Sequence, residues 1–540
     1  MRKTDAFRRA AALMAALSIT VSLAAPAFAG TYYIDYGDIT ITKNADGSQT
    51  VQYGKEDGST ATDNDSGEII ITTRDQTPAT QESDLEGPAA EDSDFGPVVE
   101  DNYQPAAPAQ PEDADQPEGA DQQKDADQPE NADQQESADQ QKDADQPEGA
   151  DQPESTDQQK DADQQKDADQ QKDADQQAQP QQAAPVASTP VKYWKNTITV
   201  INIFTDTVLN LTLKNVKIDV SDADGKAALS VQGDGNVTIE LDGNNELKSG
   251  NLKAGLEKNT SEGTLTLKDD KEAGSGSLTA EGGGWAAGIG GSDGKGTNNI
   301  IISGGTVTAE GGNYGAGIGS GGGSYDGGDH ITITGGTVNA TGGAWGAGIG
   351  GGYGDDSDHI TITGGTVTAE GGNYGAGIGG GYGGVGDHIT ISGGAVTAIG
   401  GRVGGAGIGG GYSGDGDHIT ITGGKVTAEG GNSGAGIGGG YWGRGRNITV
   451  SGAAQVTAVA GKSDEDNFSG FGATIGDGGT SDTDSEGAFL PGKEINADIN
   501  GLTPGYIHHV IYNPDGSVKR EWWEPESARP TPVSYTHLRA

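Results

Sequence analysis

The sequence predicts an all-β protein, a single-stranded parallel β-helix (β-solenoid) of about nine coils, joined to a long disordered acidic linker. Three observations predict this fold. A pattern of about 29 residues recurs from residue 298 onward, short stretches within each copy alternate apolar and polar residues, and glycine pairs separate those stretches. One copy cannot bury its apolar face alone, whereas stacked copies can. The repeat therefore predicts stacked coils.

The copy at residues 358–386 shows the elements expected in one coil. Residues 359–363 alternate isoleucine with polar residues and predict a first strand, and residues 366–369 predict a second. Residues 375–379, GAGIG, predict a third, thin strand. Glycine-rich corners separate the three strands, because glycine adopts the conformations that tight turns require.

Aligned apolar residues extend the coils to the whole of residues 191–482. The first-strand column is Leu213, Leu241, Leu267, Ile302, Ile333, Ile362, Ile391, Ile421 and Val450. The second-strand column is Ile218, Leu247, Leu278, Val307, Val338, Val367, Val396, Val426 and Val456. The third-strand column is Leu229, Leu256, Ile289, Ile318, Ile349, Ile378, Ile408, Ile437 and Ile475. Nine members in each column predict about nine coils.

Shorter β segments flank this array. Residues 30–77 contain strand-like stretches at 32–36, 38–42 and 69–71, too few to bury a core alone, and we expect them to form an N-terminal cap on the first coil. After the array, the pattern changes at residues 483–532, which predict a C-terminal β cap or the start of another module.

The linker occupies residues 78–190. Its central part, 113–178, repeats acidic six-residue units such as DADQQK and contains no aromatic or branched aliphatic side chain. A period of six forms no amphipathic helix or strand face, so no burial offsets the ordering entropy. The segment is typical of a disordered, extended spacer.

The chain ends carry other signals. Residues 1–29 combine a basic start, an apolar stretch and the cleavage pattern Ala27-Phe28-Ala29, which predicts a secretory signal peptide and a secreted or cell-surface protein. Residues 533–540 resemble a translated sequencing adapter, so we expect the natural C-terminus, with any wall-attachment signal, to be missing.

Composition excludes several classes of protein. The 540 residues include 80 acidic and 33 basic side chains, a net charge of -47, and no cysteine. Disulfide scaffolds and thiolate metal sites are excluded, and a polyanion without a basic stripe is a poor partner for nucleic acid. The apolar stretch near the N-terminus is too short to span a membrane.

Aromatic residues recur in two rows beside the third strand. The row before it is Trp285, Tyr314, Trp345 and Tyr374, and the row after it is Tyr353, Tyr382, Tyr412 and Tyr441. Rings in rows can stack on the apolar faces of sugars, which makes these residues candidates for carbohydrate binding. The alternative is an intramolecular ladder whose rings stabilise the corners.

Acidic and imidazole side chains form two further columns at the start of the first strand. The acidic column is Asp329, Asp358, Asp387 and Asp417, and the imidazole column is His330, His359, His388 and His418. Like charges on adjacent coils favour a bound Ca²⁺, although such Asp side chains also accept hydrogen bonds from turn backbone. Strand alternation predicts that Asp and His point to opposite faces, which favours a stacked imidazole ladder over a transition-metal site.

Several motifs together resemble a known family. ITITGGTVTAEGG, GAGIGGGY, VTIELDGNNELKSG at 237–250 and AGLEKNTSEGTLTLKDD at 254–270 are similar to a bacterial carbohydrate-binding family of secreted parallel β-helix proteins with a pectate-lyase-like fold. The resemblance covers about 191–480 and extends to 31–73. It implies cellulose or pectin-type polysaccharides as ligands and bound calcium.

These observations predict a secreted, monomeric, non-catalytic polysaccharide-binding protein with Ca²⁺ as a candidate cofactor. The main alternative is a structural stalk or adhesin without glycan specificity. A polysaccharide lyase or hydrolase is less favoured, because the acidic residues recur by repetition whereas a catalytic site is a unique constellation. Outward Thr-x-Thr pairs also suit an ice-binding surface, but threonine simply fits exposed strand positions.

Overall fold

The computed structural model describes residues 30–74, 191–259, 261–270, 276–324, 330–463 and 469–530. The predicted signal peptide, the predicted linker, Asp329 and residues 533–540 lie outside these ranges. The predicted all-β parallel solenoid is confirmed, with only two 3-10 turns, η1 (Ile34–Tyr36) and η2 (Glu526–Ala528), among the described residues. No helix in this part of the chain is long and apolar enough to cross a membrane.

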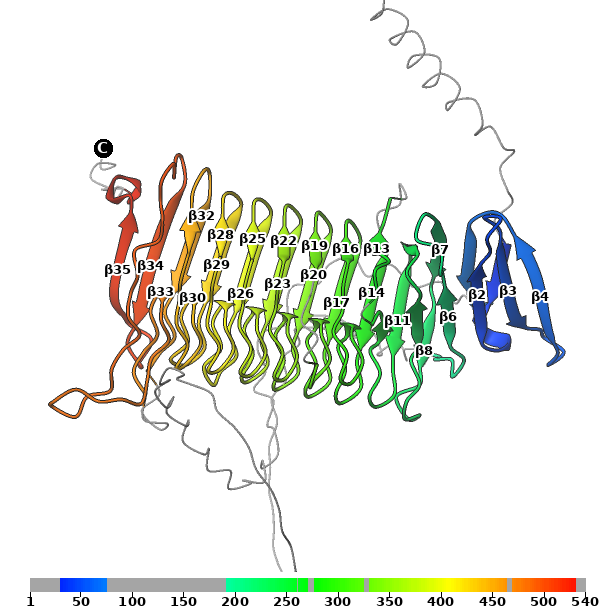
Figure 1. Cartoon of the computed structure of the whole chain (residues 1–540), viewed down its shortest axis with the longest axis horizontal. Coiled ribbons are helices and arrows are strands. Elements are labelled where there is room, and N and C mark those ends of the chain that lie inside the picture. Colours follow the sequence, from blue (N-terminus) through cyan, green and yellow to red (C-terminus); the bar gives the residue numbers. More distant parts are fainter. Residues whose placement is uncertain are drawn as a thin grey trace, which may run out of the picture. The chain divides into compact units, whose positions relative to one another are not determined.

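Each strand of the expected coil builds its own sheet, and the three sheets run side by side along the stack (Figure 1). The first-strand sheet contains, in order, β1 (Gly30–Tyr33), β5 (Ile69–Thr72), β7 (Val208–Lys214), β10 (Asn236–Asp242), β13 (Leu265–Lys268), β16 (Ile300–Ile302), β19 (Ile331–Ile333), β22 (Ile360–Ile362), β25 (Thr390–Ile391), β28 (Thr420–Ile421) and β31 (Thr449–Val450). The second-strand sheet contains β8 (Lys217–Asp219), β11 (Asn244–Lys248), β14 (Ser277–Glu281), β17 (Thr306–Glu310), β20 (Thr337–Thr341), β23 (Thr366–Glu370), β26 (Ala395–Ile399), β29 (Lys425–Glu429), β32 (Gln455–Val459), β34 (Tyr506–Tyr512) and β35 (Val518–Glu524). The third-strand sheet contains β4 (Thr60–Asp65), β3 (Gln49–Gly54), β2 (Ile39–Lys43), β6 (Ile198–Ile201), β9 (Leu229–Gln232), β12 (Leu256–Glu257), β15 (Ile289–Gly290), β18 (Ile318–Gly319), β21 (Ile349–Gly350), β24 (Ile378–Gly379), β27 (Ile408–Gly409), β30 (Ile437–Gly438) and β33 (Ile475–Gly476).

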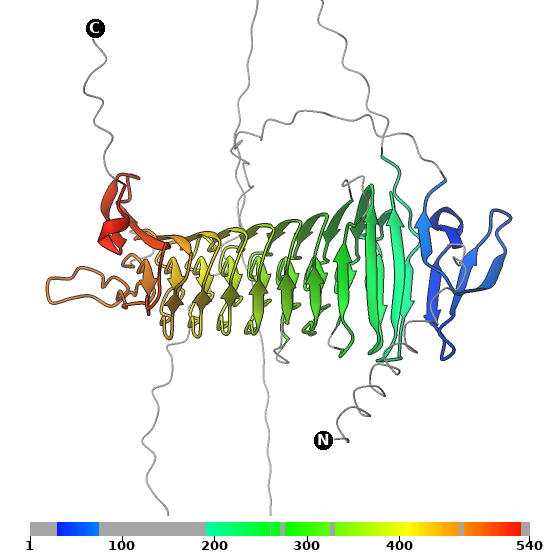
Figure 2. The same ribbon diagram turned by 90° about the horizontal axis from the view of Figure 1, so that it is seen from above.

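Nine coils follow one another from β7–β9 to β31–β33, each giving one strand to each sheet. Figure 2 shows these coils stacked in chain order. Successive strands pair in parallel, so that Ile362 lies opposite Ile391 in the first-strand sheet. The apolar columns point inward and are fully buried, which places the core along the axis of the stack. Burial of these columns is the main source of stability.

The register differs from the expected alignment at two places. Leu267 pairs with Ile239 rather than Leu241, and Leu278 pairs with Asn245 rather than Leu247. A shift of two residues returns a strand to the same face. The apolar pattern therefore could not distinguish Ile239 from Leu241, and at the second place it favoured Leu247 over the polar Asn245 that is observed.

Residues 30–74 extend the stack at its N-terminal end. β5 pairs in parallel with β7, and β2 pairs in parallel with β6. The stretch expected as a strand at 32–36 instead ends at Tyr33 and continues as η1. β3 and β4, which were not expected, add two antiparallel strands that cover the edge of the third-strand sheet.

The C-terminal end is covered in a similar way. β34 pairs in parallel with β32, and β35 folds back antiparallel on β34. The second-strand sheet thus ends in an antiparallel pair at the C-terminal end of the stack, as the third-strand sheet does at the N-terminal end. We call β34 and β35 the C-terminal pair.

Candidate functional site

The two aromatic rows meet because the strand between them is only two residues long. In the coil that contains β21, the backbone N–H of Ala347 donates to the carbonyl oxygen of Gly351 at 2.9 Å, which closes the chain around the strand. The N–H of Tyr382 then donates to the carbonyl oxygen of Trp345 in the preceding coil, also at 2.9 Å. A second-row residue is thereby held directly against a first-row residue.

Glycine permits this narrow corner. Gly379 has a φ of +135°, and a Cβ there would collide with the carbonyl oxygen of Gly409 in the next coil. Few residues other than glycine adopt that backbone region. The run of glycines around the third strand therefore allows close packing of one coil on the next.

Rings within each row stack on their neighbours. Ring centroids in the first row are 3.8 Å apart for Trp285 and Tyr314 and 4.3 Å apart for Trp345 and Tyr374. The middle step of that row, from Tyr314 to Trp345, is 6.2 Å. In the second row the stacked centroids are 5.6 Å apart for Tyr353 and Tyr382 and 5.3 Å apart for Tyr382 and Tyr412. The last ring, Tyr441, lies 5.0 Å from Tyr412 and is tilted by 52° against it.

The rows also interlock edge to face. Tyr382 lies against Trp345 with a centroid distance of 4.9 Å and an interplanar angle of 73°, and against Tyr374 at 5.6 Å and 84°. Tyr353 contacts Tyr314 and Trp345 in the same manner. We call the eight rings of the two rows the ring surface, which runs from the coil of β15 to that of β30.

Every residue of the ring surface is half-buried. Burial, together with the neighbouring Tyr441, Tyr382 and Tyr374, raises the pKa of Tyr412 to about 12. Trp442 adds a more exposed ring at the far end, 46% accessible and edge-on to Tyr441 at 5.9 Å. The ladder expected as the alternative thus exists, and the same rings remain open to solvent on one side.

The sequence did not predict that the two aromatic rows contact each other. Because the third strand lies between them, the rows were expected at separate corners of the coil. The motif GAGIGGG could have predicted this contact, because so short a strand between glycines lets the chain fold back toward the residues that precede the strand.

The Asp and His columns also meet, contrary to the expectation that they point to opposite faces. Asp358 Oδ1 lies 2.8 Å from His359 Nδ1 and 3.3 Å from His388 Nδ1. His359 has a φ of +57° and precedes β22, so strand alternation does not apply to it. The left-handed backbone turns its imidazole back toward Asp358.

The same arrangement recurs in the next coil. Asp387 Oδ1 lies 3.1 Å from the Nδ1 atoms of both His388 and His418. The imidazoles from His330 to His418 stack 4.8–4.9 Å apart, which confirms the expected imidazole ladder. Asp417 ends the row, and its Oδ1 accepts a hydrogen bond from Asn447 Nδ2 at 2.7 Å.

This donor set does not fit calcium. Ca²⁺ takes six to eight oxygen ligands, whereas Asp358, Asp387 and Asp417 each face side-chain nitrogen within 3.3 Å. Asp329 lies outside the described residues. The calcium prediction stays a prediction, and the row offers no oxygen cage for it.

Comparisons with known proteins support the coil repeat. A family model described as "Beta helix repeat" matches residues 300–322, 331–353, 360–382, 389–412 and 419–441. Each match begins in or next to the first strand of a coil, and the last four end at the second-row rings Tyr353, Tyr382, Tyr412 and Tyr441. No curated protein and no solved structure matches the chain.

Proposed function

We propose that this chain is a secreted, monomeric, non-catalytic protein that binds an extended polysaccharide along the ring surface. The observation that carries the proposal is the continuity of partly exposed rings over successive coils. A polysaccharide is itself a repeat of rings with apolar C–H faces, so a periodic aromatic surface can contact several sugars in succession. Pre-organised side chains also limit the entropy lost on binding.

Polar groups beside the rings suit sugar hydroxyls. Asn313 and Asn373 directly precede Tyr314 and Tyr374, and both amides are exposed. An amide offers donors and an acceptor, which matches a hydroxyl that both donates and accepts. Because the faces of the inner rings are partly covered by neighbouring rings, we expect contact through ring edges, tyrosine hydroxyls and these amides, with Trp442 offering the most open ring.

A structural stalk or adhesin is the second candidate. The mutual stacking of the rings favours it, since a ladder alone stabilises the corners without any ligand. The two candidates differ in whether the rings contribute to binding beyond their contribution to folding.

A direct test uses the full secreted chain in pull-down and affinity electrophoresis against cellulose, xylan and polygalacturonate, with added calcium and with chelator. We expect retention by at least one polymer without release of reducing or unsaturated ends. Loss of retention with chelator would support a calcium-assisted contact. Retention by none of the polymers would favour the stalk, and release of sugar would replace the proposal with an enzyme.

A further inference from the structure

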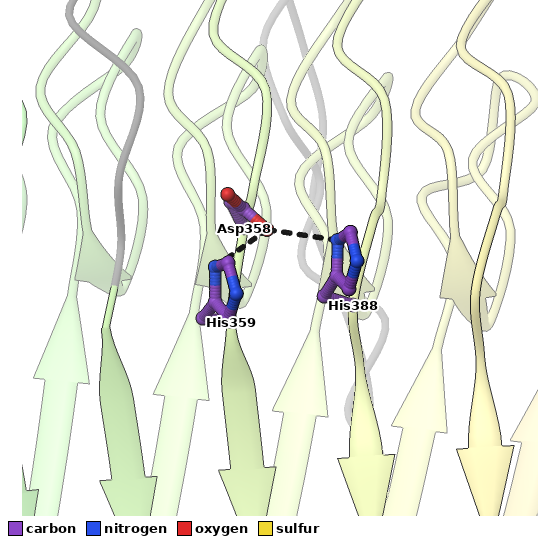
Figure 3. Close-up of side chains that lie close together, drawn as sticks. All are labelled: Asp358, His359 and His388. Carbon is purple, nitrogen blue, oxygen red and sulfur yellow. Dashed lines mark ion pairs between the residues drawn. The ribbon is translucent and has the colours of Figure 1, made fainter.

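Three side chains from two coils converge at the start of the first strand (Figure 3). Asp358 Oδ1 lies 2.8 Å from His359 Nδ1 and 3.3 Å from His388 Nδ1, and the three atoms all lie within 4.8 Å of one another. Two imidazole nitrogens thus lie beside one carboxylate oxygen. The chain offers no thiolate ligand, because it contains no cysteine.

Backbone geometry fixes this convergence. His359 and His388 have φ values of +57° and +48°, a left-handed conformation that is uncommon for residues other than glycine. Each imidazole is therefore directed by its own backbone and by the stacked ring of the next coil, 4.9 Å away. The backbone thus holds both imidazoles beside the Asp358 carboxylate before any ligand arrives.

The carboxylate oxygen at the centre of this cluster lacks a hydrogen bond. Asp358 Oδ1 is shielded from solvent but accepts no hydrogen bond of acceptable geometry, although two imidazole nitrogens lie near it. Asp387 differs, since its Oδ1 accepts the backbone N–H of His388 at 2.8 Å. A buried oxygen without a donor is unfavourable unless a cation or a donor completes it.

We propose that Asp358, His359 and His388 bind a divalent transition-metal ion of the Zn²⁺, Ni²⁺, Co²⁺ or Cu²⁺ type. Imidazole nitrogen and carboxylate oxygen are preferred ligands of these ions, whereas calcium prefers oxygen alone. In a tetrahedral site with ligands ~2.0–2.1 Å from Zn²⁺, the ligand atoms lie about 3.3 Å apart. The two Asp–His distances of 2.8 and 3.3 Å are close to that separation, and the two imidazoles, stacked 4.9 Å apart, would tilt toward each other to reach the same ion.

The three side chains are accessible to an ion from solvent, and they supply fewer ligands than the ion needs. The side chains of Asp358, His359 and His388 are 39%, 48% and 49% exposed, so an ion can enter and the rings can tilt toward it. Three protein ligands leave a coordination position for water or an outside ligand, as in sites that are not purely structural.

A second group, Asp387, His388 and His418, repeats the arrangement one coil further. His388 Nδ1 belongs to both groups and can ligate only one ion at a time. We therefore expect one ion per chain for these five residues.

The chain itself provides the design of a matched variant. Asn447 occupies the position of the imidazoles in a later coil, with a φ of +48°, and donates to Asp417 Oδ1 at 2.7 Å. His388→Asn should therefore keep the backbone conformation and a hydrogen bond to the carboxylate while removing the nitrogen ligand. His508→Ala, which removes an imidazole from β34 outside the cluster, is the control.

The experiment titrates the full chain, purified without a histidine tag, with ZnCl₂, CoCl₂ and CaCl₂ by calorimetry and by visible absorption for Co²⁺. We expect one Zn²⁺ or Co²⁺ per chain, no comparable Ca²⁺ binding at this site, and affinity at least about tenfold weaker in His388→Asn. His508→Ala should bind as the unmodified chain does. Equal Zn²⁺ affinity in the unmodified chain and in folded His388→Asn would overturn the proposal, and so would a Co²⁺ spectrum unchanged by that substitution. Neither result depends on polysaccharide binding.

Discussion

Single residues set how closely one coil lies on the next, and Gly379 is the clearest case. Its φ of +135° and the carbonyl oxygen of Gly409 leave no space for a side chain. Gly379→Ala should therefore destabilise the solenoid by about 2 kcal/mol or more, through collision and backbone strain together. Thermal unfolding followed by circular dichroism measures the effect.

Gly383 supplies the control for that substitution. It also has a positive φ, +74°, but no atom lies within 4 Å of where its Cβ would be. Gly383→Ala should lower stability only by about 1–2 kcal/mol of conformational strain. If both variants unfold at the same temperature, close backbone approach at Gly379 is not what limits the corner.

Backbone conformation at single residues also explains what the sequence could not predict. The columns of Asp and His were visible, but their meeting depends on a left-handed φ at His359, His388 and His418. Strand alternation was applied one residue too early, because β22 begins only at Ile360. Histidine, like the asparagine at 447, adopts that conformation more often than most residues, but the strand pattern of residues 359–363 outweighed this signal.

At the scale of single strands, β34 of the C-terminal pair carries a buried imidazole, that of His509. His509 is 3% exposed, its Nδ1 lies 2.7 Å from Thr474 Oγ1, and its ring stacks on Trp522 at 4.4 Å. Burial, and then the positive charge of His508 and Arg520, lowers the pKa of His509 to about 4. The folded pair therefore holds this imidazole neutral.

The depressed pKa makes the C-terminal pair sensitive to acid. The unfolded chain takes up a proton near the ordinary pKa of 6.5 and the folded chain only near 4, so the stabilisation is full above about pH 6.5 and is lost as pH falls toward 4. The shift corresponds to roughly 3 kcal/mol. Urea unfolding from pH 7.5 to 4 should show this loss in the unmodified chain and a smaller loss in His509→Gln.

Glu494 lies in the same contact group and acts in the opposite direction. Its side chain accepts hydrogen bonds from Thr474, and burial raises its pKa, which favours the folded state as pH falls. The difference between the unmodified chain and His509→Gln isolates the imidazole. Parallel pH profiles for the two proteins would show that His509 does not titrate on unfolding.

Strands were predictable where periodicity was regular. The third-strand column agrees with the observed pairing at every step, from Leu229 with Leu256 to Ile437 with Ile475. β3 and β4 escaped prediction because their solvent-facing residues are mostly polar, although the Asp-Gly pair at 57–58 between them is typical of a hairpin turn. An antiparallel edge pair buries too little apolar surface to leave a clear pattern.

At the scale of the whole molecule, stability should be close to a sum over coils, since each coil contacts only its neighbours. Deleting residues 387–416 would remove the coil of β25, β26 and β27. The new junction would fit, because Gly386 and Gly416, the residues before the two cut points, already lie side by side in adjacent coils. The shortened chain should fold, with a stack about 4.8 Å shorter and a slightly lower unfolding temperature.

Circular dichroism and small-angle scattering check that deletion. The variant should also retain the metal site, because His418 would take the position of His388 beside Asp358. Loss of β-structure or aggregation would mean that the coils are not interchangeable.

The whole-molecule architecture could be predicted because the repeat dictates it, whereas the ring surface could not be fully assigned. Sequence periodicity placed all eight rings in rows, but the edge-to-face contact between Trp345 and Tyr382 depends on how a two-residue strand folds back. Ligand identity depends on contacts with a molecule that the chain does not contain.

The central claim is that the ring surface binds polysaccharide, and one comparison tests it most directly. Trp345→Ala with Tyr374→Ala removes two stacked rings from adjacent coils. Thr361→Ala with Thr363→Ala removes partly or fully exposed side chains from the first-strand side of the coil that contains Tyr374. Both variants are assayed for polymer retention per folded molecule, well below their unfolding temperatures. We predict at least about a tenfold loss of affinity for the ring variant, equivalent to about 1.4 kcal/mol, and none for the threonine variant. Unchanged affinity in a folded ring variant would contradict the claim and leave the rings as a structural ladder.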